Sequence, residues 1–378
     1  MKAAVLEDVE KMTVRPVPDP EVRSNEVLIR VKAVGVCGTD LHLFRGQGNY
    51  NLDQSGRPVP LREQPQILGH EFAGEILETG GTVNDLKPGD EVLCDQGRNC
   101  HSHGREELCE YCASGDSHQC RFYQEHGITG LPGALAEYIA IPAVNCVRLS
   151  GKMTASEGAL VEPLGCVLHA CDRMTRAEGR YKLGAGPRVR NIMISGAGPA
   201  GLLFLQVLRQ VYGFDGLILI SDLREKNLDL ARQFGGTALN ASRENVVEAA
   251  KEMTRGEGIQ YLIESCGNPV IFDQIPGLLR KQGTVLLYGH GHKGRDIGVM
   301  GNVLFLEPAL VASVGASGGF DEGGRPSIYR RARDLMSEGR VQAMPFVTHR
   351  YTALENVHSA FEQDFGREDY IKGLLTLN

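Results

Sequence analysis

The stretch CHSHGREELCEYCASGDSHQC, residues 100–120, places four cysteines and three histidines within twenty-one residues. Thiolates and imidazoles at such short spacings are common ligands of zinc. The chain has ten cysteines, and only Cys100, Cys109, Cys112 and Cys120 form a cluster. In a reducing compartment, clustered cysteines bind metal more often than they form disulfides, so this pattern predicts a metal site.

Two further stretches, VCGTDLH (36–42) and LGHE (68–71), hold a second set of possible ligands. Zinc that takes part in catalysis usually has three protein ligands and one position open to water or substrate. Cys37, His70 and Glu71 fit that requirement, and Glu162 in VEPLGCVLHA is a further acid. Each also has a structural explanation: Cys37 as a small buried hydrophobe, His70 and Glu71 as a surface pair, and Glu162 as a helix cap.

The segment GAGPAG (196–201) has the spacing G-x-G-x-x-G, which is weak evidence by itself. Here it follows the apolar stretch NIMIS and precedes LLFLQVLRQV, as a dinucleotide-binding turn between strand and helix requires. Gly196 permits the tight turn, Gly198 lets a pyrophosphate approach the helix N-terminus, and Gly201 lets helix and strand pack closely. The candidate cofactor-binding residues of this turn are Gly196, Gly198, Pro199, Ala200 and Gly201.

An acidic residue follows the glycine turn at the distance expected for a ribose ligand. Asp222 lies twenty-one residues beyond Gly201, at the end of the next apolar segment, GLILISD. A carboxylate there accepts hydrogen bonds from the adenosine ribose and repels a 2′-phosphate, which favours NAD over NADP. Arg224 and Lys226 lie close by and weaken this preference.

The apolar patterns indicate two kinds of structure that position these residues. Before about residue 150, segments such as VLIRVKAVGV and DEVLCD alternate as strands do, with turns such as KPGD between them. After about residue 155, strands and amphipathic helices alternate, which indicates a doubly wound parallel sheet. From about 308 the pattern is mixed, and the strand-like YIKGLLTL could fold back on the first domain. We therefore expect an α/β protein with one β-rich and one doubly wound domain.

Length and composition exclude several classes of function. At 378 residues the chain is long for one core, and two domains are expected. The net charge of −7 argues against nucleic-acid binding, which needs a surplus of Lys and Arg. The N-terminal MKAAVLEDVEKMTVR lacks the apolar run of a signal peptide, and no apolar run approaches the ~20 residues needed to cross a bilayer. We expect a cytoplasmic protein that binds neither nucleic acid nor membrane.

Taken together and in order, the motifs resemble the zinc-containing medium-chain dehydrogenases, in the polyol branch of sorbitol, threonine and butanediol dehydrogenases. They cover nearly the whole chain: CGTDLH, GHE, KPGDEV, the cysteine cluster, VEPL, GAGPAG and ESCGN. The resemblance implies a GroES-like catalytic domain interrupted by a Rossmann domain that binds NAD(P). We expect the catalytic zinc-binding domain to span 1–160 and 308–378, and the NAD-binding domain to span 161–307.

The resemblance also implies roles for individual residues of a catalytic zinc site. Cys37 and His70 match zinc ligands, and Glu71 and Glu162 match acids that serve as ligands or support the site. Whether Glu71, Glu162 or both contact the metal stays open. Thr39 and His42 match a relay that carries the substrate proton to water by way of the nicotinamide ribose. His42 could instead be a hydrogen-bonded loop histidine.

The cysteine cluster matches a structural zinc site of the same family. Its members often hold this zinc with four cysteines ending in C-x2-C-x7-C, the spacing of Cys109, Cys112 and Cys120. The gap before the second cysteine is eight residues here, HSHGREEL, where the family usually has two. Cys100 is therefore the doubtful ligand. His101 or His103 could replace it, and Cys94 is a remoter candidate.

The function implied is NAD-dependent oxidation of a secondary hydroxyl of a polyol, sugar or sugar-like alcohol. A butanediol or threonine dehydrogenase is an alternative within this branch. A nucleotide-binding zinc or redox sensor and a zinc-free quinone reductase are less well supported by the motifs. A polar insertion between Cys37 and His70 could cover the substrate, act as a solvated loop or form a subunit contact; its candidate residues are Arg45, Asn49, Tyr50 and Arg57. The family commonly forms dimers or tetramers, and PALVASVGAS (308–317) could supply an edge strand.

Overall fold

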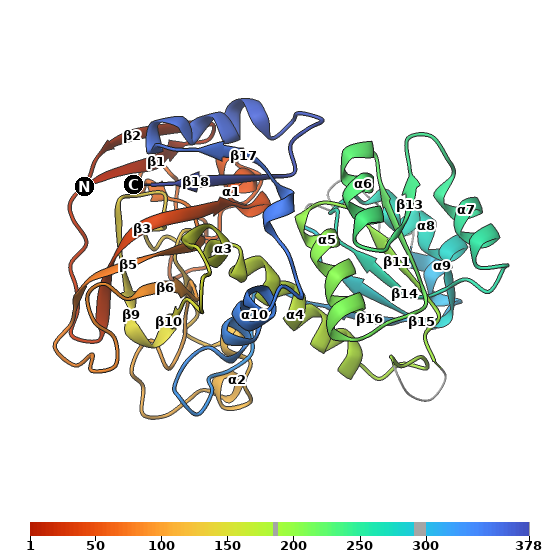
Figure 1. Cartoon of the computed structure of the whole chain (residues 1–378), viewed down its shortest axis with the longest axis horizontal. Coiled ribbons are helices and arrows are strands. Elements are labelled where there is room, and N and C mark those ends of the chain that lie inside the picture. Colours follow the sequence, from red (N-terminus) through yellow and green to blue (C-terminus); the bar gives the residue numbers. More distant parts are fainter. Residues whose placement is uncertain (184–187, 291–299, 378) are drawn as a thin grey trace. The chain divides into compact units, whose positions relative to one another are not determined.

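The computed structural model describes residues 1–183, 188–290 and 300–377, and the chain forms two compact units (Figure 1). Unit 1 consists of Met1–Gly165, Ala316–Gly339 and Ala343–Asn378. Unit 2 consists of Cys166–Gly315 and Arg340–Gln342. Unit 1 is therefore assembled from segments that precede and follow unit 2 in the sequence. The helix α4 (Val161–Arg176) contains the first change from one unit to the other.

The main sheet of unit 1 joins distant parts of the chain. Its strands are β3 (Glu26–Val36), β5 (Glu71–Thr79), β6 (Glu91–Cys94), β9 (Tyr138–Pro142), β10 (Cys146–Arg148), β17 (Val347–Tyr351) and β18 (Lys372–Thr376). Their order is β10-β6-β5-β3-β18-β17, and β9 also pairs with β3. The segment YIKGLLTL does return to the first domain, because β18 pairs antiparallel with β3. The end of β3 thus lies between β5 and β18.

The remaining elements of unit 1 are short and surround this sheet. The other strands are β1 (Lys2–Asp8), β2 (Lys11–Pro16), β4 (Gln66–Ile67), β7 (Gly97–Arg98) and β8 (Gln124–Glu125). The helices are α1 (Gly38–Phe44), α2 (Glu110–Ala113), α3 (Ala155–Ala159) and α10 (Ser327–Ser337). The shorter helical turns are η1 (Ser117–Gln119), η2 (Ala143–Asn145), η5 (Met344–Phe346), η6 (Leu354–Asn356) and η7 (Ala360–Asp364). The core fills with the inward residues of the alternating strands, such as Val27, Ile29 and Val31 of β3.

Unit 2 is a doubly wound α/β domain, as the sequence predicted. Its strands are β11 (Asn191–Ser195), β12 (Leu217–Asp222), β13 (Thr237–Asn240), β14 (Ile259–Glu264), β15 (Leu279–Leu287) and β16 (Ala309–Ala312). They pair in parallel in the order β13-β12-β11-β14-β15-β16. The helices are α5 (Pro199–Gln206), α6 (Glu225–Gln233), α7 (Val246–Met253), α8 (Val270–Leu278) and α9 (Met300–Leu304), and η3 (Val207–Val211) continues α5. The reversal of strand order between β12 and β14, on either side of β11, places ligands at the carboxyl ends of these strands.

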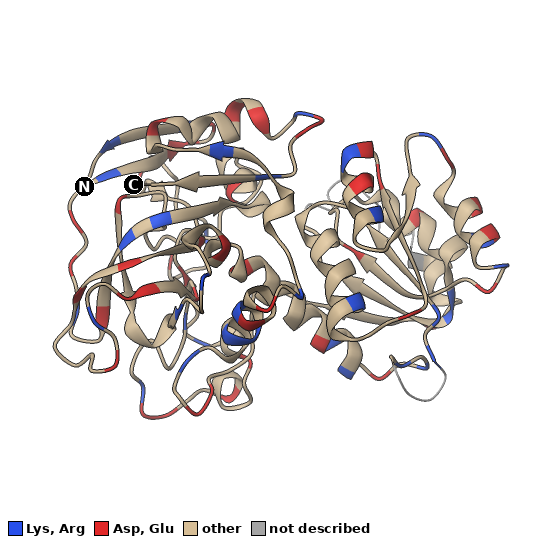
Figure 2. Cartoon of the chain, in the orientation of Figure 1, with Lys and Arg blue, Asp and Glu red and all other residues tan. Residues whose placement is uncertain are grey.

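The charged residues of both units are mixed in sign. Figure 2 shows Lys and Arg interspersed with Asp and Glu along the backbone of each unit. Among the helices of the described ranges, none has the length and apolarity needed to span a bilayer.

Candidate metal and cofactor sites

One candidate metal site combines the end of β3 with the start of β5. Ligand atoms of Cys37, His70 and Glu71 all lie within 4.8 Å of one another. Antiparallel pairing produces this meeting, because Gly35 of β3 is directly opposite Glu71 of β5. Cys37 follows β3 immediately and His70 precedes β5 immediately, so the two ligands sit at adjacent strand ends. The three residues that the sequence singled out in CGTDLH and GHE are therefore brought together.

Asp40 is a buried acid that ties the two ligand segments to each other. Its Oδ2 accepts a hydrogen bond from the Cys37 N–H (2.9 Å), and its Oδ1 accepts one from the Gly69 N–H (3.2 Å). The same Oδ1 lies 3.2 Å from Nδ1 of His70. Burial disfavours the charged imidazole, but the negative charges of Asp40 and Cys37 outweigh it and raise the pKa of His70 well above its usual range. Sequence reasoning missed Asp40, although it lies within the quoted motif.

Glu71 is fully buried and is paired with an ammonium group from β18. Nζ of Lys372 lies 2.6 Å from each carboxylate oxygen of Glu71, and its hydrogen bond is to Oε1. Burial opposes the charged lysine, but Glu71 and Cys37 outweigh it and raise the pKa of Lys372. Gly35 is required here, because a Cβ at that position would overlap Oε2 of Glu71. Sequence reasoning also missed Lys372. The one feature that could have revealed it is the presence of a charged residue within the apolar segment YIKGLLTL.

Glu162 lies close to a different set of partners. It is in the first turn of α4, where a carboxylate is favourable whether or not a metal is bound. Its Oε1 accepts a hydrogen bond from Nε2 of Gln96 (3.1 Å), and Oε1 of Gln96 accepts one from the hydroxyl of Tyr329 (2.5 Å). The group of ligand atoms within 4.8 Å does not include Glu162. Its role as a ligand stays a prediction.

Thr39 and His42 lie on α1, directly after Cys37. They are three positions apart, a spacing that places two side chains on one face of a helix. Both are half-buried. Nδ1 of His42 is 2.6 Å from Oε1 of Gln47, and the Gln47 N–H donates to the His42 carbonyl oxygen (2.8 Å). An amide oxygen only accepts, so Nδ1 carries the hydrogen and Nε2 is the nitrogen left to accept a proton.

The second candidate metal site is the cysteine cluster, and its members are the four predicted cysteines. The Sγ atoms of Cys100, Cys109, Cys112 and Cys120 all lie within 4.8 Å of one another. Sγ of Cys120 lies 3.6 Å from Sγ of Cys100 and 3.8 Å from Sγ of Cys109. A backbone N–H from Cys112 is the largest factor that lowers the pKa of Cys109, to about 6. A thiol that ionises this readily is a favourable zinc ligand.

The long gap after Cys100 is accommodated by a reversal of the chain. Three hydrogen bonds turn the backbone immediately: His103 N–H to Asn99 O, Gly104 N–H to His101 O, and Arg105 N–H to Cys100 O. The last of these spans only five residues, so the inserted residues form a compact projecting turn. The Cys109 N–H then donates to Sγ of Cys100 (3.4 Å). The eight-residue gap therefore leaves Cys100 in the cluster.

The alternative ligands are all engaged elsewhere. The His101 ring stacks on Phe320, with ring centroids 4.1 Å apart, and Nε2 of His103 is 3.2 Å from the Phe122 carbonyl oxygen. Cys94 lies on β6 opposite Cys146 of β10, and their sulfurs are 3.8 Å apart. The geometry favours Cys100 over each of them.

We expect Cys100→Ser to lower the bound zinc from about two ions per chain to about one. The remaining three thiolates no longer close a tetrahedral site, and the free energy of unfolding should fall by about 4 kcal/mol. Metal analysis by mass spectrometry together with urea unfolding checks both values. His101→Ala is the matched control in the same turn and should retain both ions. Loss of zinc from the control, with retention in Cys100→Ser, would reverse the ligand assignment.

The glycine turn of unit 2 has the shape that a dinucleotide requires. Gly196 has φ +101°, which favours glycine, and a Cβ at Gly201 would overlap the Gly196 carbonyl oxygen. A Cβ at Gly198 would meet no atom within 4 Å, so the backbone there borders open space. Pro199 and Ala200 form the first turn of α5, whose unpaired N–H groups face this space. The turn thus leaves room for a phosphate beside a helix N-terminus.

Asp222 ends β12 and is bonded to the same turn. Its Oδ2 accepts a hydrogen bond from the Ala197 N–H (2.9 Å), and its Oδ1 accepts one from the Arg224 N–H (2.9 Å). Nε of Arg224 is 3.5 Å from Oδ1, so its guanidinium is directed toward the carboxylate. The acid therefore lies at the carboxyl edge of the sheet, one strand away from the glycine turn.

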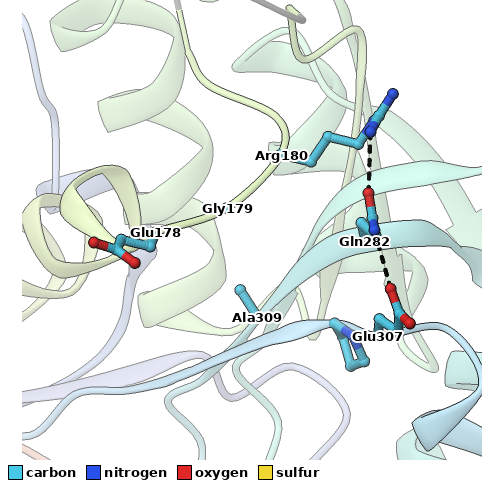
Figure 3. A pocket seen from close by; sticks show the side chains of 7 residues that line it. Glu178, Gly179, Arg180, Gln282, Glu307 and Ala309 are labelled. Carbon is cyan, nitrogen blue, oxygen red and sulfur yellow. Dashed lines mark hydrogen bonds between the residues drawn. The ribbon is translucent and has the colours of Figure 1, made fainter.

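A cavity of about 470 Å³ lies at the opposite edge of the same sheet (Figure 3). Its lining includes Gln282 near the start of β15 and Ala309 at the start of β16. A chain of hydrogen bonds joins Arg180 Nη1 to Gln282 Oε1 (3.1 Å) and Gln282 Nε2 to Glu307 Oε2 (3.0 Å). Ligands of doubly wound sheets bind at the carboxyl ends of the strands, so this cavity is not the expected place for a dinucleotide.

Comparisons with known proteins identify the family of this chain. The alcohol dehydrogenase GroES-like domain matches residues 23–151, and the zinc-binding dehydrogenase domain matches residues 199–337. Sorbitol dehydrogenase of Bacillus subtilis (strain 168) is 29% identical over 366 residues, covering 96% of this chain and 93% of the relative. L-threonine 3-dehydrogenase of Legionella pneumophila (strain Corby) is 31% identical over 274 residues, or 72% of each chain. The solved structure of a zinc-binding dehydrogenase from Sinorhizobium meliloti 1021 bound to NADP has a TM-score of 0.80 at 28% identity, covering 99% of this chain and 98% of that one.

Proposed function

Because the chain belongs to the zinc-binding alcohol dehydrogenase family, we propose that it oxidises a secondary hydroxyl of a polyol or sugar-like alcohol with NAD. The observation that carries this proposal is the meeting of the half-buried Cys37 with the buried His70 and Glu71. The catalytic zinc-binding domain is proposed to span 1–160 and 308–378, and the NAD-binding domain 161–307. We also propose a cytoplasmic location, which is consistent with a cluster of thiols that a reducing compartment keeps free to bind metal.

The residues present fit a catalytic zinc ion. A thiolate, an imidazole and a carboxylate are its usual donors, and all three lie together here, the imidazole and the carboxylate buried and the thiol half-buried. Nδ1 of His70 faces Asp40 Oδ1 at 3.2 Å, so Nε2 is the nitrogen that would bind the ion, oriented by the carboxylate behind the ring. Cys37 and His70 would hold the ion together with Glu71, Glu162 or both. When bound, zinc supplies a Lewis acid that polarises the substrate oxygen.

The chain itself supplies the path for the substrate proton. Thr39 Oγ1 would accept the hydroxyl proton as it releases its own toward His42, and Nε2 of His42 would take up that proton and pass it to water. Imidazole is suited to exchanging protons near neutral pH, and Gln47 fixes the tautomer that leaves Nε2 available. Asp40 keeps the Cys37 and His70 segments together while this occurs.

The polar insertion between Cys37 and His70 is proposed to cover the substrate. Asn49 Nδ2 donates to the Val59 carbonyl oxygen (2.7 Å), and Val59 N–H donates to the Asn51 carbonyl oxygen (2.8 Å), so the insertion is an ordered turn. A Cβ at Gly130 would meet the Asn51 side chain, and a Cβ at Gly127 would meet the Gly69 backbone. The insertion is therefore packed against the loop that lies behind His70. Of its four polar candidates, Arg45, Tyr50 and Arg57 are exposed and Asn49 is half-buried.

A substrate screen tests the proposal directly. The panel contains polyols, sugar acids, 2,3-butanediol and L-threonine, each with NAD and with NADP. We expect turnover of a compound with a secondary hydroxyl, followed by absorbance of the reduced nicotinamide. L-threonine is the second candidate substrate, because curated relatives at up to 31% identity are threonine dehydrogenases. Turnover of simple primary alcohols alone would contradict the polyol proposal.

We expect Asp222→Asn to lower the ratio of kcat/KM for NAD to that for NADP about tenfold. Asparagine keeps an oxygen that can accept the Ala197 N–H but loses the charge that repels a 2′-phosphate. Steady-state kinetics with both cofactors check the ratio. Asp229→Asn on α6 removes an exposed carboxylate paired with Arg232 and should leave the ratio unchanged. An unchanged ratio in Asp222→Asn would show that Asp222 does not select the cofactor.

We propose that the protein forms a homodimer or homotetramer through the edge of the unit 2 sheet. Within the described ranges β16 pairs with β15 alone, and Leu310 on it is 49% exposed. Leu310→Arg should shift the protein to monomers in sedimentation velocity, because a charge would be buried in the contact. Met253→Arg changes an exposed residue of α7 and should leave the assembly intact. Identical sedimentation of the two variants would exclude this edge as the contact.

A further inference from the structure

A buried carboxylate joins the ends of two neighbouring strands at the cofactor edge of unit 2. Glu264 is the last residue of β14 and is 1% exposed. Its Oε1 accepts hydrogen bonds from the N–H groups of Cys266 (2.8 Å) and Gly267 (2.7 Å). Its Oε2 accepts one from the N–H of Gly289, just after β15 (3.1 Å). One side chain therefore fixes the loop after β14 and attaches it to the loop after β15.

The two loops are too close for side chains to separate them. A Cβ at Gly267, which has φ +69°, would overlap the carbonyl oxygen of His290. A Cβ at Gly289 would overlap the backbone nitrogen of Gly267 and lie 2.6 Å from Oε2 of Glu264. Backbone packing this close brings polar groups together, and the carboxylate satisfies the N–H groups that face it.

The loop after β14 also supports the glycine turn. The Ser265 hydroxyl donates to the carbonyl oxygens of Ser195 (2.9 Å) and Gly196 (3.2 Å). A Cβ at Gly196 would lie 2.9 Å from the Cβ of Cys266, so the two backbones are in contact. The glycine turn, the loop after β14 and the start of the loop after β15 therefore form a continuous layer along the carboxyl edge of the sheet.

Strand order shows which half of a dinucleotide this layer meets. The glycine turn follows β11 and receives the pyrophosphate, while Asp222 at the end of β12 receives the adenosine ribose. β12 and β14 lie on opposite sides of β11, and β15 lies beyond β14. A dinucleotide that places its adenosine over β12 must extend its nicotinamide half over β14 and β15. Glu264 lies beneath that half.

We propose that Glu264 is a positioning residue that holds the two loops beneath the nicotinamide half of the cofactor. The proposal rests on the proposed function, since it requires that unit 2 bind a nicotinamide dinucleotide. Glu264 touches neither cofactor nor substrate. It acts by keeping the backbone of residues 265–267 and 288–290 in one arrangement, against which the nicotinamide and its ribose can lie. The adenosine half, held by Asp222 and the glycine turn, does not depend on it in the same way.

The test compares two ligands on one variant. In Glu264→Gln the shape is kept, but one accepting oxygen becomes an NH2 group that cannot accept an N–H. NADH carries both halves of the cofactor, whereas ADP carries only the adenosine half with its pyrophosphate. We expect the Kd for NADH, measured by fluorescence, to rise about tenfold, and the Kd for ADP, measured by calorimetry, to change by less than about twofold.

Two further variants separate positioning from general destabilisation. Asn245→Ala removes a side chain that caps α7 by accepting the N–H groups of Val247 and Glu248, so it also costs unit 2 backbone hydrogen bonds. It should change the Kd of neither ligand. Gly267→Ala forces the loops apart because its Cβ would overlap the His290 carbonyl oxygen. It should again weaken the binding of NADH more than the binding of ADP.

The outcomes are distinguishable. A higher Kd for NADH in Glu264→Gln, with the Kd for ADP nearly unchanged, supports the proposal. Equal weakening of both ligands, or no change in either, overturns it while leaving the dehydrogenase assignment intact. If the unaltered protein binds neither NADH nor ADP, the proposed function fails and the role of Glu264 fails with it.

Discussion

Cys37→Ala is expected to lower kcat about a thousandfold while leaving the protein folded. Cys37 is the soft, charged ligand among the three residues that meet at the ends of β3 and β5. Alanine leaves His70 and Glu71, and Glu71 is already bonded to Lys372. A site with so few donors should not retain zinc. Metal analysis should therefore show a fall from about two ions per chain to about one, alongside the loss of turnover.

Cys146→Ala is the matched control for this experiment. Cys146 is also a buried cysteine of unit 1, but it belongs to neither group of ligand atoms, and its sulfur lies 3.8 Å from that of Cys94. Its loss should cost packing energy of about 1 kcal/mol and leave zinc content and kcat nearly unchanged. Retention of both zinc ions and of activity by Cys37→Ala would remove the basis of the catalytic site.

Lys372→Met is expected to lower the free energy of unfolding by about 3 kcal/mol, because it leaves the buried carboxylate of Glu71 without its counter-charge. The double variant Lys372→Met with Glu71→Gln should recover much of that loss, since the uncompensated charge is then gone. Urea unfolding of the unaltered protein, both single variants and the double variant gives the coupling energy. A loss in the double variant equal to the sum of the two single losses would show that the pair is not coupled.

Metal should alter this result in a defined direction. A zinc ion beside Glu71 supplies positive charge that partly replaces the missing ammonium. The destabilisation caused by Lys372→Met should therefore be smaller in zinc-loaded protein than in chelator-treated protein. Lys372→Arg keeps the charge, so it should be less destabilised than Lys372→Met both with zinc and after treatment with chelator. A larger loss in the zinc-loaded protein would place the metal away from Glu71.

The sequence predicted the elements and motifs better than it predicted what holds the motifs in place. The alternation of apolar residues identified β3 and β6, and apolar runs identified β11 and β12, because burial on one face leaves an alternation and burial on both faces leaves a continuous run. The strand β13 was not predicted. The glycine turn was recognisable because its three glycines have separate reasons to lack a side chain. Gly196 has a positive φ, Gly201 packs against the Gly196 backbone, and Gly198 leaves room for a phosphate. The four cysteines were recognised as a cluster, but the reversal of the chain after Cys100, which decides the first ligand, depends on three backbone hydrogen bonds.

The supporting residues were missed because their partners are remote in the sequence. Lys372 meets Glu71 across 301 positions, and Tyr329 meets Gln96 across 233. Neither pairing has a periodicity or spacing that a single chain could reveal. Asp40 lies only three positions from Cys37 in the sequence. Only the pairing of β3 with β5, however, shows that Asp40 joins Cys37 to Gly69. Local patterns predict elements, whereas the contacts between strand ends follow from the assembled sheet.

The insertion of β18 beside β3 has a consequence for biosynthesis. At ribosomal rates of about 5 to 20 residues per second, Lys372 emerges roughly 15 to 60 s after Glu71. During that interval the nascent chain carries a carboxylate whose partner has not been translated, and β3 exposes the backbone that β18 later occupies. The last strand of the unit 2 sheet, β16, ends at Ala312 and is translated before Lys372, so this sheet can form co-translationally. Chaperones that shield open strand edges should therefore associate with nascent chains until β18 has left the exit tunnel.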